Sequence, residues 1–185
     1  MKNKVLLNVL CTIILTIFIS SPAVLSSTQS IKIIKDQEYF PLVDRAIKNA
    51  KSSIQVIAFE VGYYPEHPLS PSNILIQDLI AAQRRGVKVR VILEVSDWNQ
   101  RVTKKNKYSG KILSKGGVKV RYDPPDITTH AKLIIIDSSV AILGSNNWTY
   151  YSLAKNRELA VLIHSPSIVR EIKDYFENLW KESRS

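Results

Sequence analysis

Residues 129–149 read THAKLIIIDSSVAILGSNNWT, and this stretch decides the fold. His130 stands two residues before Lys132, and the apolar run that follows ends at Asp137. The segments KLIIID and VAIL are separated only by two serines, which predicts neighbouring strands joined by a tight turn. Because side chains at positions i and i+2 of a strand point to one face, we expect His130 and Lys132 to share a pocket.

The rest of the chain alternates strand patterns with helix patterns. Apolar or alternating runs predict strands over residues 31–36, 54–59 and 158–164, and amphipathic periodicity predicts a helix over residues 166–183. The sequence GVKVR occurs at residues 86–90 and 117–121, each time where a predicted helix ends at glycine. This alternation predicts a single α/β domain over residues 27–185, with a mixed, largely parallel central β-sheet flanked by helices on both faces.

The first 26 residues differ from the rest. A basic start, an apolar run over residues 5–19 and a small-residue exit predict a signal peptide that is cut after Ser26. The alternative is an uncleaved membrane anchor through residues 5–19. Either reading predicts a secreted or periplasmic protein, membrane-anchored in the second case. The single cysteine, Cys11, lies in this leader, so no disulfide is expected in the domain.

The chain is strongly basic, with 26 Lys and Arg against 16 Asp and Glu. Such an excess favours nucleic acid or acidic lipid as a partner. Residues 101–117 carry six basic side chains and no acidic one, next to an aromatic residue. The candidate nucleic-acid contacts are Lys104, Lys105, Lys107 and Trp98. The alternative is an ordinary solvated helix face.

The residues around His130 fit attack on phosphorus. A neutral imidazole can act as the nucleophile while Lys132 holds the anionic phosphoryl group. Ser145 and Asn147, from GSNN, can donate to its oxygens, and Glu158, from NRE, can orient the imidazole and stabilise its charged form. No HExxH motif, cysteine pair or aspartate cluster is present in the sequence. We therefore expect no metal and no cofactor.

HAKLIIID, GSNN and NRE together resemble the HKD signature of the phospholipase D superfamily, and most closely its short, single-motif, secreted endonuclease-like branch. The resemblance implies catalysis through a covalent phosphohistidine without metal. His130 would be the nucleophile, and Lys132, Ser145 and Asn147 would bind phosphate. Glu158 would orient the histidine, and Asp137 would have a supporting role.

The mechanism requires two histidines, one to attack and one to protonate the leaving oxygen. Only His130 is followed by a lysine at the required spacing, since His67 and His164 lack it. The sequence therefore predicts a homodimer in which two copies of His130 meet across a twofold axis. The resemblance implies the same arrangement.

Three functions remain open from the sequence. The first is a non-specific endonuclease that cleaves DNA, RNA or both. The second is a phospholipase D or phosphatidyltransferase that acts on membrane phospholipids. The third is a non-catalytic nucleic-acid-binding protein, which would need Lys132 but neither His130 nor Glu158.

Overall fold

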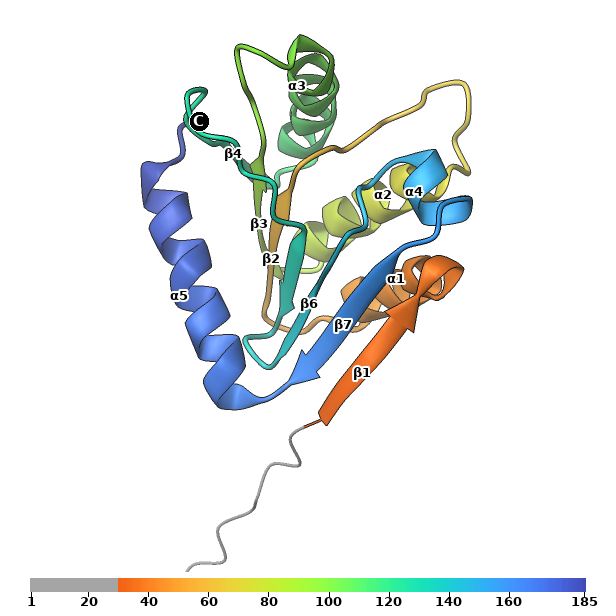
Figure 1. Cartoon of the computed structure of the whole chain (residues 1–185), viewed down its shortest axis with the longest axis vertical. Helices are drawn as coiled ribbons and strands as arrows, with labels where there is room; N and C mark the ends of the chain where they lie inside the picture. Colours follow the sequence, from red (N-terminus) through yellow and green to blue (C-terminus); the bar gives the residue numbers. More distant parts are fainter. Residues whose placement is uncertain (1–29) are drawn as a thin grey trace, which may run out of the picture.

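Seven strands form one sheet in the computed structural model, which describes residues 30–185 (Figure 1). The predicted leader, with Cys11 and the cut after Ser26, lies outside these residues. The strands are β1 (Ser30–Lys35), β2 (Ser53–Ala58), β3 (Lys88–Leu93), β4 (Lys119–Tyr122), β5 (Leu133–Ile136), β6 (Val140–Gly144) and β7 (Leu159–His164). The helices are the 3-10 turn η1 (Asp36–Glu38), α1 (Tyr39–Asn49), α2 (Pro71–Arg84), α3 (Gln100–Lys115), α4 (Tyr150–Ala154) and α5 (Pro166–Glu182).

The strand order is β1-β7-β6-β5-β2-β3-β4, and its directions are mixed, as predicted. Only β2–β3 and β3–β4 pair in parallel, whereas the other four of the six strand pairs within residues 30–185 are antiparallel. The prediction of a largely parallel sheet is therefore wrong. Helical crossovers, α2 and α3, produce the parallel pairs, whereas the tight turn between β5 and β6 permits only antiparallel pairing.

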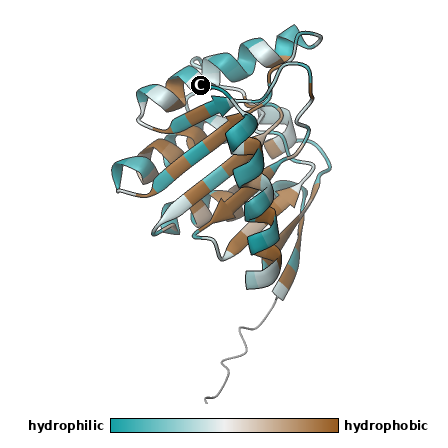
Figure 2. Cartoon of the chain, turned by 90° about the vertical axis from the view of Figure 1, so that its left-hand side faces the viewer, coloured by the Kyte–Doolittle hydropathy of each residue, from teal (hydrophilic) through white to brown (hydrophobic). Residues whose placement is uncertain are grey.

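Helices cover both faces of the sheet, as predicted, but unequally. The cluster on one face includes Val43 of α1, Leu79 of α2, Leu113 of α3 and Leu153 of α4. On the other face, α5 crosses from β7 towards β4, where the Arg121 guanidinium lies 4.7 Å from the centre of the Trp180 ring. Beside α5, part of β1, β6 and β7 has no helix over it (Figure 2).

Side chains from distant parts of the sequence meet at one edge of the sheet. The parallel strands β2, β3 and β4 end at this edge, and β5 begins there because it is antiparallel to β2. For the same reason β6 ends and β7 begins there. The residues that follow or precede these strand ends are Phe59, Glu94, Asp123, His130, Ser145 and Glu158. This edge, which we call the active edge, holds the candidate site.

Asp137 lies at the opposite edge, in the turn after β5. Its carboxylate accepts hydrogen bonds from the backbone amides of Lys51 (2.9 Å), Ser52 (2.7 Å) and Ser53 (2.9 Å). Burial alone would raise the pKa of Asp137, but these amides together lower it. The supporting role predicted for Asp137 is therefore structural, since the carboxylate ties the β5–β6 turn to the start of β2.

Replacing Asp137 by alanine should lower the free energy of unfolding at pH 7 by about 2 to 4 kcal/mol, because three amides lose a charged acceptor. The folded-state pKa lies below the ordinary 3.8, so this stabilisation is present above pH 3.8 and is lost as the pH falls through the folded-state pKa. Urea unfolding should show a difference in unfolding free energy between the variant and the wild type at pH 7, and a smaller difference in acid. Asp126→Ala, at an exposed loop position, is the control and should change stability by less than about 0.5 kcal/mol. Equal losses in the two variants would contradict this role.

Candidate active site

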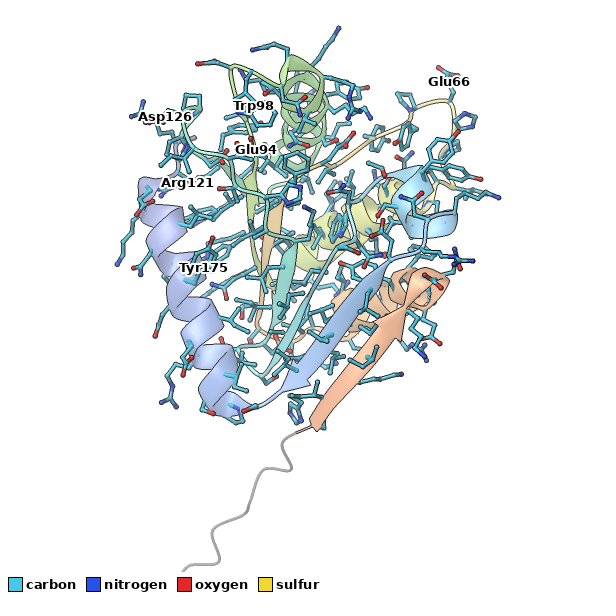
Figure 3. The ribbon with its side chains drawn as sticks, viewed as in Figure 1. Glu66, Glu94, Trp98, Arg121, Asp126 and Tyr175 are labelled. Carbon is cyan, nitrogen blue, oxygen red and sulfur yellow. The ribbon has the colours of Figure 1, made fainter. Side chains whose placement is uncertain are left out.

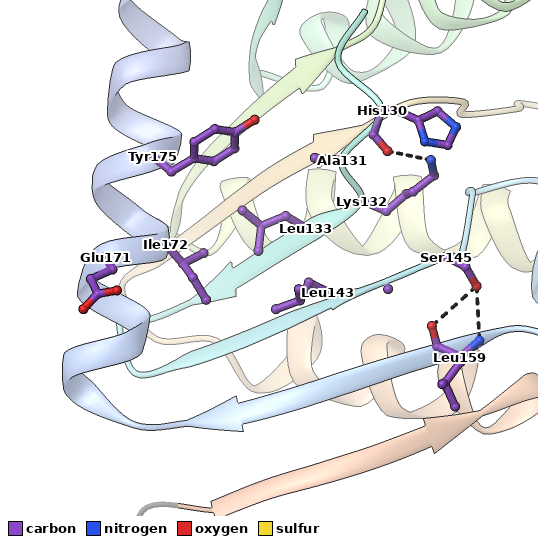
Figure 4. A pocket seen from close by; sticks show the side chains of 11 residues that line it. His130, Ala131, Lys132, Leu133, Leu143, Ser145, Leu159, Glu171, Ile172 and Tyr175 are labelled. Carbon is purple, nitrogen blue, oxygen red and sulfur yellow. Dashed lines mark hydrogen bonds between the residues drawn. The ribbon is translucent and has the colours of Figure 1, made fainter.

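His130 and Lys132 lie together at the start of β5, as predicted. The ammonium of Lys132 donates to the carbonyl oxygen of His130 at 2.6 Å (Figure 4). It also lies 4.8 Å from the centre of the Phe59 ring. The His130 imidazole packs edge-on against the same ring, with the two ring centres 4.4 Å apart. Phe59, the residue after β2, therefore supports both side chains, a role that the sequence did not reveal.

The surroundings of the two side chains favour the neutral form of the imidazole. Partial desolvation lowers the pKa of His130, and the nearby charge of Lys132 lowers it further. Burial lowers the pKa of Lys132, which is 9% exposed, while the negative charge of Glu158 opposes that shift. A neutral imidazole has the free lone pair that nucleophilic attack requires.

Ser145 lies at the end of β6 and is held in place by β7. Its amide donates to the carbonyl oxygen of Leu159 at 3.0 Å, and its hydroxyl accepts from the Leu159 amide at 3.1 Å and donates to Glu158. At Gly144, a Cβ atom would lie 2.5 Å from the Cβ atom of Ala160. The glycine of GSNN is therefore required for the close approach of β6 and β7 that positions Ser145.

Within one protomer Glu158 binds other side chains than His130, so the orienting role predicted for it stays a prediction. Besides Ser145, its carboxylate accepts from the hydroxyl of Ser152 at 2.7 Å and from the side-chain amide of Asn156 at 3.2 Å. No hydrogen bond joins Glu158 to the imidazole within the described protomer. The reason is topological, because Glu158 precedes β7, two strands from β5, and Ser145 lies nearer.

Asn147 is partly buried, next to Ser145 and close to the active edge. Its side-chain oxygen is buried without a hydrogen-bond partner among residues 30–185, as are both polar side-chain atoms of Asn146. A buried amide without a partner is unusual and marks a place where a further polar group would bind. Asn147 does not line the pocket that contains His130, so its predicted contact with phosphate remains a prediction.

The basic segment forms α3, which is fastened to the active edge by Asn106. The buried Asn106 amide donates to the carbonyl oxygens of Phe59 (2.7 Å) and Glu94 (2.8 Å) and accepts from the Val61 amide (2.8 Å). The sequence signal for this role was a polar residue on the apolar stripe of a helix, at the spacing of Val102 and Leu113. The carbonyl oxygens that Asn106 binds are recognisable only in the folded structure.

The predicted nucleic-acid contacts on and before α3 divide into two groups. Lys105 binds the buried carboxylate of Glu60 at 2.7 Å, and Arg101 binds it at 2.9 Å. Lys105 is therefore an ion-pair partner of Glu60, which corrects its predicted role. Lys104, Lys107 and Trp98 are exposed, as a contact surface requires, and Trp98 lies at the active edge (Figure 3).

One pocket of about 730 Å³ contains His130, Lys132 and Ser145 (Figure 4). Its remaining lining is mostly apolar and comes from the sheet and from α5, including Leu133, Leu143, Leu159, Ile172 and Tyr175. Within residues 30–185, no group of three or more His, Cys, Asp or Glu side chains is arranged to hold a metal ion. None of the helices in this range is long and apolar enough to cross a bilayer. The pocket thus combines an imidazole, an ammonium group and a hydroxyl group above an apolar floor.

Comparison with known proteins relates this chain to a family. Residues 43–180 match the model of a family described as "Cardiolipin synthase, PLD-like domain". Mitochondrial cardiolipin hydrolases of Mus musculus and Canis lupus familiaris are 31% and 34% identical over 75% of this chain, which covers 56% and 49% of them. The chain thus spans about half of their length. The structure of Nuc, a phospholipase D family member from Salmonella typhimurium, superposes with a TM-score of 0.70 at 25% identity, covering 84% of this chain and 97% of Nuc.

Removing the charge of Lys132 should raise the pKa of His130 towards the ordinary value of 6.5, because a nearby cation disfavours the imidazolium. The measurement is an NMR titration of the imidazole in wild type and Lys132→Met, with the His130 signal assigned by its loss in His130→Ala. Lys111→Met, on the exposed side of α3, is the control and should leave the titration unchanged. A pKa that stays the same or falls in Lys132→Met would contradict the electrostatics of the site.

Proposed function

Because this chain belongs to the phospholipase D superfamily, we propose that it is a phosphodiester hydrolase that works without metal and, more narrowly, a non-specific endonuclease of DNA or RNA. One observation carries the proposal: His130, Lys132 and Ser145 share one end of one pocket. The nucleophile and the groups that bind charged oxygens are therefore close enough to act on the same phosphodiester.

In the proposed first step, a ring nitrogen of His130 attacks phosphorus. The P–N bond forms as the P–O bond to the leaving group breaks, which gives a phosphohistidine. Lys132 stabilises the charge that develops on the other phosphoryl oxygens, and Ser145 adds to this when its hydroxyl turns from Glu158 to one of them. The leaving oxygen requires a proton, which His130 of the partner subunit supplies from its imidazolium form and so becomes neutral. In the second step the partner's His130 removes a proton from water, the water oxygen bonds to phosphorus and the P–N bond breaks.

The other two histidines of this chain are poorly placed to supply that proton. His164 ends β7 at the edge opposite the active edge, and five residue steps of strand span about 17 Å. His67 lies in the loop before α2 and is not among the residues that line the pocket of His130. A second copy of the chain remains as the source of the second imidazole.

The uncovered part of the sheet offers a surface for that second copy. Leu143 is 36% exposed, Ile33 48% and Leu159 57%, and all three point to the face that α5 leaves open. Leu143 and Leu159 also line the pocket with His130. An exposed apolar surface next to an incomplete active site favours a homodimer that buries this surface and joins the two sites.

The exposed part of α3 favours nucleic acid as the substrate. Arg101 and Lys105 bind Glu60, which directly follows Phe59, and therefore hold the helix beside the active edge. Lys104, Lys107 and Trp98 remain exposed there, and such groups bind phosphates and stack on bases. A second candidate, phospholipid cleavage or transfer, is favoured by the apolar floor of the pocket, where an acyl chain would fit.

His130→Ala should lower phosphodiester turnover by at least about 10³-fold, because it removes the nucleophile. The assay is nicking of plasmid DNA in EDTA, run beside RNA and cardiolipin vesicles. His164→Ala, at the opposite edge of the sheet, is the matched control and should retain wild-type turnover.

Each other outcome of this assay has a distinct meaning. Loss of wild-type activity in EDTA would contradict metal-independent catalysis. Cleavage of cardiolipin without cleavage of nucleic acid would favour the second candidate. Binding of nucleic acid without turnover of any substrate would indicate a non-catalytic binding protein.

Leu143→Glu should convert the dimer to a monomer, because a charge would be buried in the apolar interface. Light scattering should give the mass of two chains for the wild type and of one chain for the variant. Turnover by the variant should be at least about 10-fold lower than that of the wild type. Leu69→Glu, at the most exposed large apolar side chain within residues 30–185, is the control and should remain dimeric. A fully active monomer would contradict the shared active site.

A further inference from the structure

Two buried carboxyl groups converge on the backbone amide directly before His130. Glu94 follows β3 and is fully buried, and its carboxylate accepts from the Thr129 amide at 2.7 Å. Asp123 follows β4, is 2% exposed, and accepts from the same amide at 3.1 Å. One N–H group therefore lies between two carboxyl groups. Neither the sequence pattern nor the proposed chemistry requires this arrangement.

Both carboxyl groups belong to a rigid frame. The carbonyl oxygen of Glu94 accepts from the buried Asn106 side chain at 2.8 Å, and its amide donates to the carbonyl oxygen of Ala58 at 3.1 Å. The second oxygen of Asp123 accepts from the Val95 amide at 2.7 Å. Figure 3 shows Glu94 at the upper end of the sheet. The pair is thus attached to the sheet and to α3, and not only to the loop that ends at Thr129.

The pair of carboxyl groups fastens the loop of residues 125–128 at its end. Residues 125–128 are exposed, whereas Thr129 is buried and is followed at once by His130. The Thr129 amide is therefore the point where an exposed loop is fastened to the frame immediately before the candidate nucleophile.

The electrostatics indicate a proton between the two groups. Burial raises the pKa of Glu94 to about 8, and the neighbouring Asp123 contributes to that rise. Neither carboxyl group forms an ion pair with another residue in the described part of the chain, and one oxygen of Glu94 has no partner there. His130 and Lys132 follow Thr129 in the chain, and the cations Arg101 and Lys105 of α3 bind Glu60.

We propose that Glu94 and Asp123 are positioning residues for His130: they share one proton at neutral pH and together fix the Thr129 amide, which sets where the imidazole lies. A neutral Glu94 can donate its proton to Asp123 and still accept from Thr129. When that proton is lost, two buried negative charges repel each other and a single N–H group must serve both. The loop then loosens at Thr129, and His130 loses its fixed position.

The first test does not depend on the proposed enzymatic activity. In an NMR pH titration of the full protein, the Thr129 amide signal should shift with a midpoint at about pH 8. In Glu94→Gln this transition should disappear, because the amide side chain keeps both hydrogen-bonding functions without titrating. Asp78→Asn is the matched control, since Asp78 is a buried carboxyl group on α2 whose pKa is also raised, to about 7. In this variant the Thr129 transition should remain.

The second test measures the consequence for catalysis with bis(p-nitrophenyl) phosphate, and it rests on the proposed function. The wild-type kcat should fall above about pH 8, whereas Glu94→Gln should stay within about 3-fold of wild type at pH 7 and remain active at higher pH. Glu94→Leu should lose on the order of 10- to 100-fold in kcat with a smaller change in KM, because His130 is misplaced.

The outcomes separate the proposal from the function. A Thr129 transition that persists in Glu94→Gln, or a loss of kcat in Glu94→Gln as large as in Glu94→Leu, would overturn the positioning role. A second outcome is also informative: Glu94→Gln abolishes the Thr129 transition, but the wild type cleaves no phosphodiester. This result would support the shared proton and contradict only the proposed function.

Discussion

The antiparallel pairing of β5 with β2 is the constraint on which the site depends. In this register Leu133 lies opposite Ile57 and Ile136 opposite Ile54. Because β2 ends where β5 begins, Phe59 lies beside His130 and Lys132 although more than 70 residues separate them in the sequence. A slip of one residue would turn both catalytic candidates to the other face and move Leu133 and Ile135 out of their cluster under α5. The apolar run thus fixes the orientation of the histidine.

The part of the sheet that α5 does not cover lies beside His130 and is the proposed dimer surface. The helix α5 crosses one face and leaves Leu143 and Leu159 exposed next to His130. The proposed dimer would bury these side chains in its interface. The same open surface is where the second histidine would have to enter. Stability of the assembly and completion of the active site would therefore have one physical origin.

The sequence predicted the elements of the site better than their connections. The spacing of His130 and Lys132 was sufficient because it is local, and strand geometry alone places both side chains on one face. The contact of Glu158 with His130 stays a prediction, since within one protomer strand order brings Ser145 to that carboxylate instead. Glu94, Asp123 and Asn106 were missed because polar residues inside a fold become recognisable only when their partners are known. The strand directions were predicted wrongly in part. The repeated GVKVR runs into β3 and β4, which form parallel pairs, and it gives no information on the direction of the other strands.

In the proposed mechanism His130 forms a covalent bond to phosphorus. Mass spectrometry can detect this bond if the protein is quenched during turnover of a phosphodiester and digested under conditions that preserve phosphoramidates. We expect a phosphoryl adduct on the peptide that contains His130, absent without substrate. An adduct on another residue, or rapid turnover with no adduct at any time point, would rule out His130 as the nucleophile.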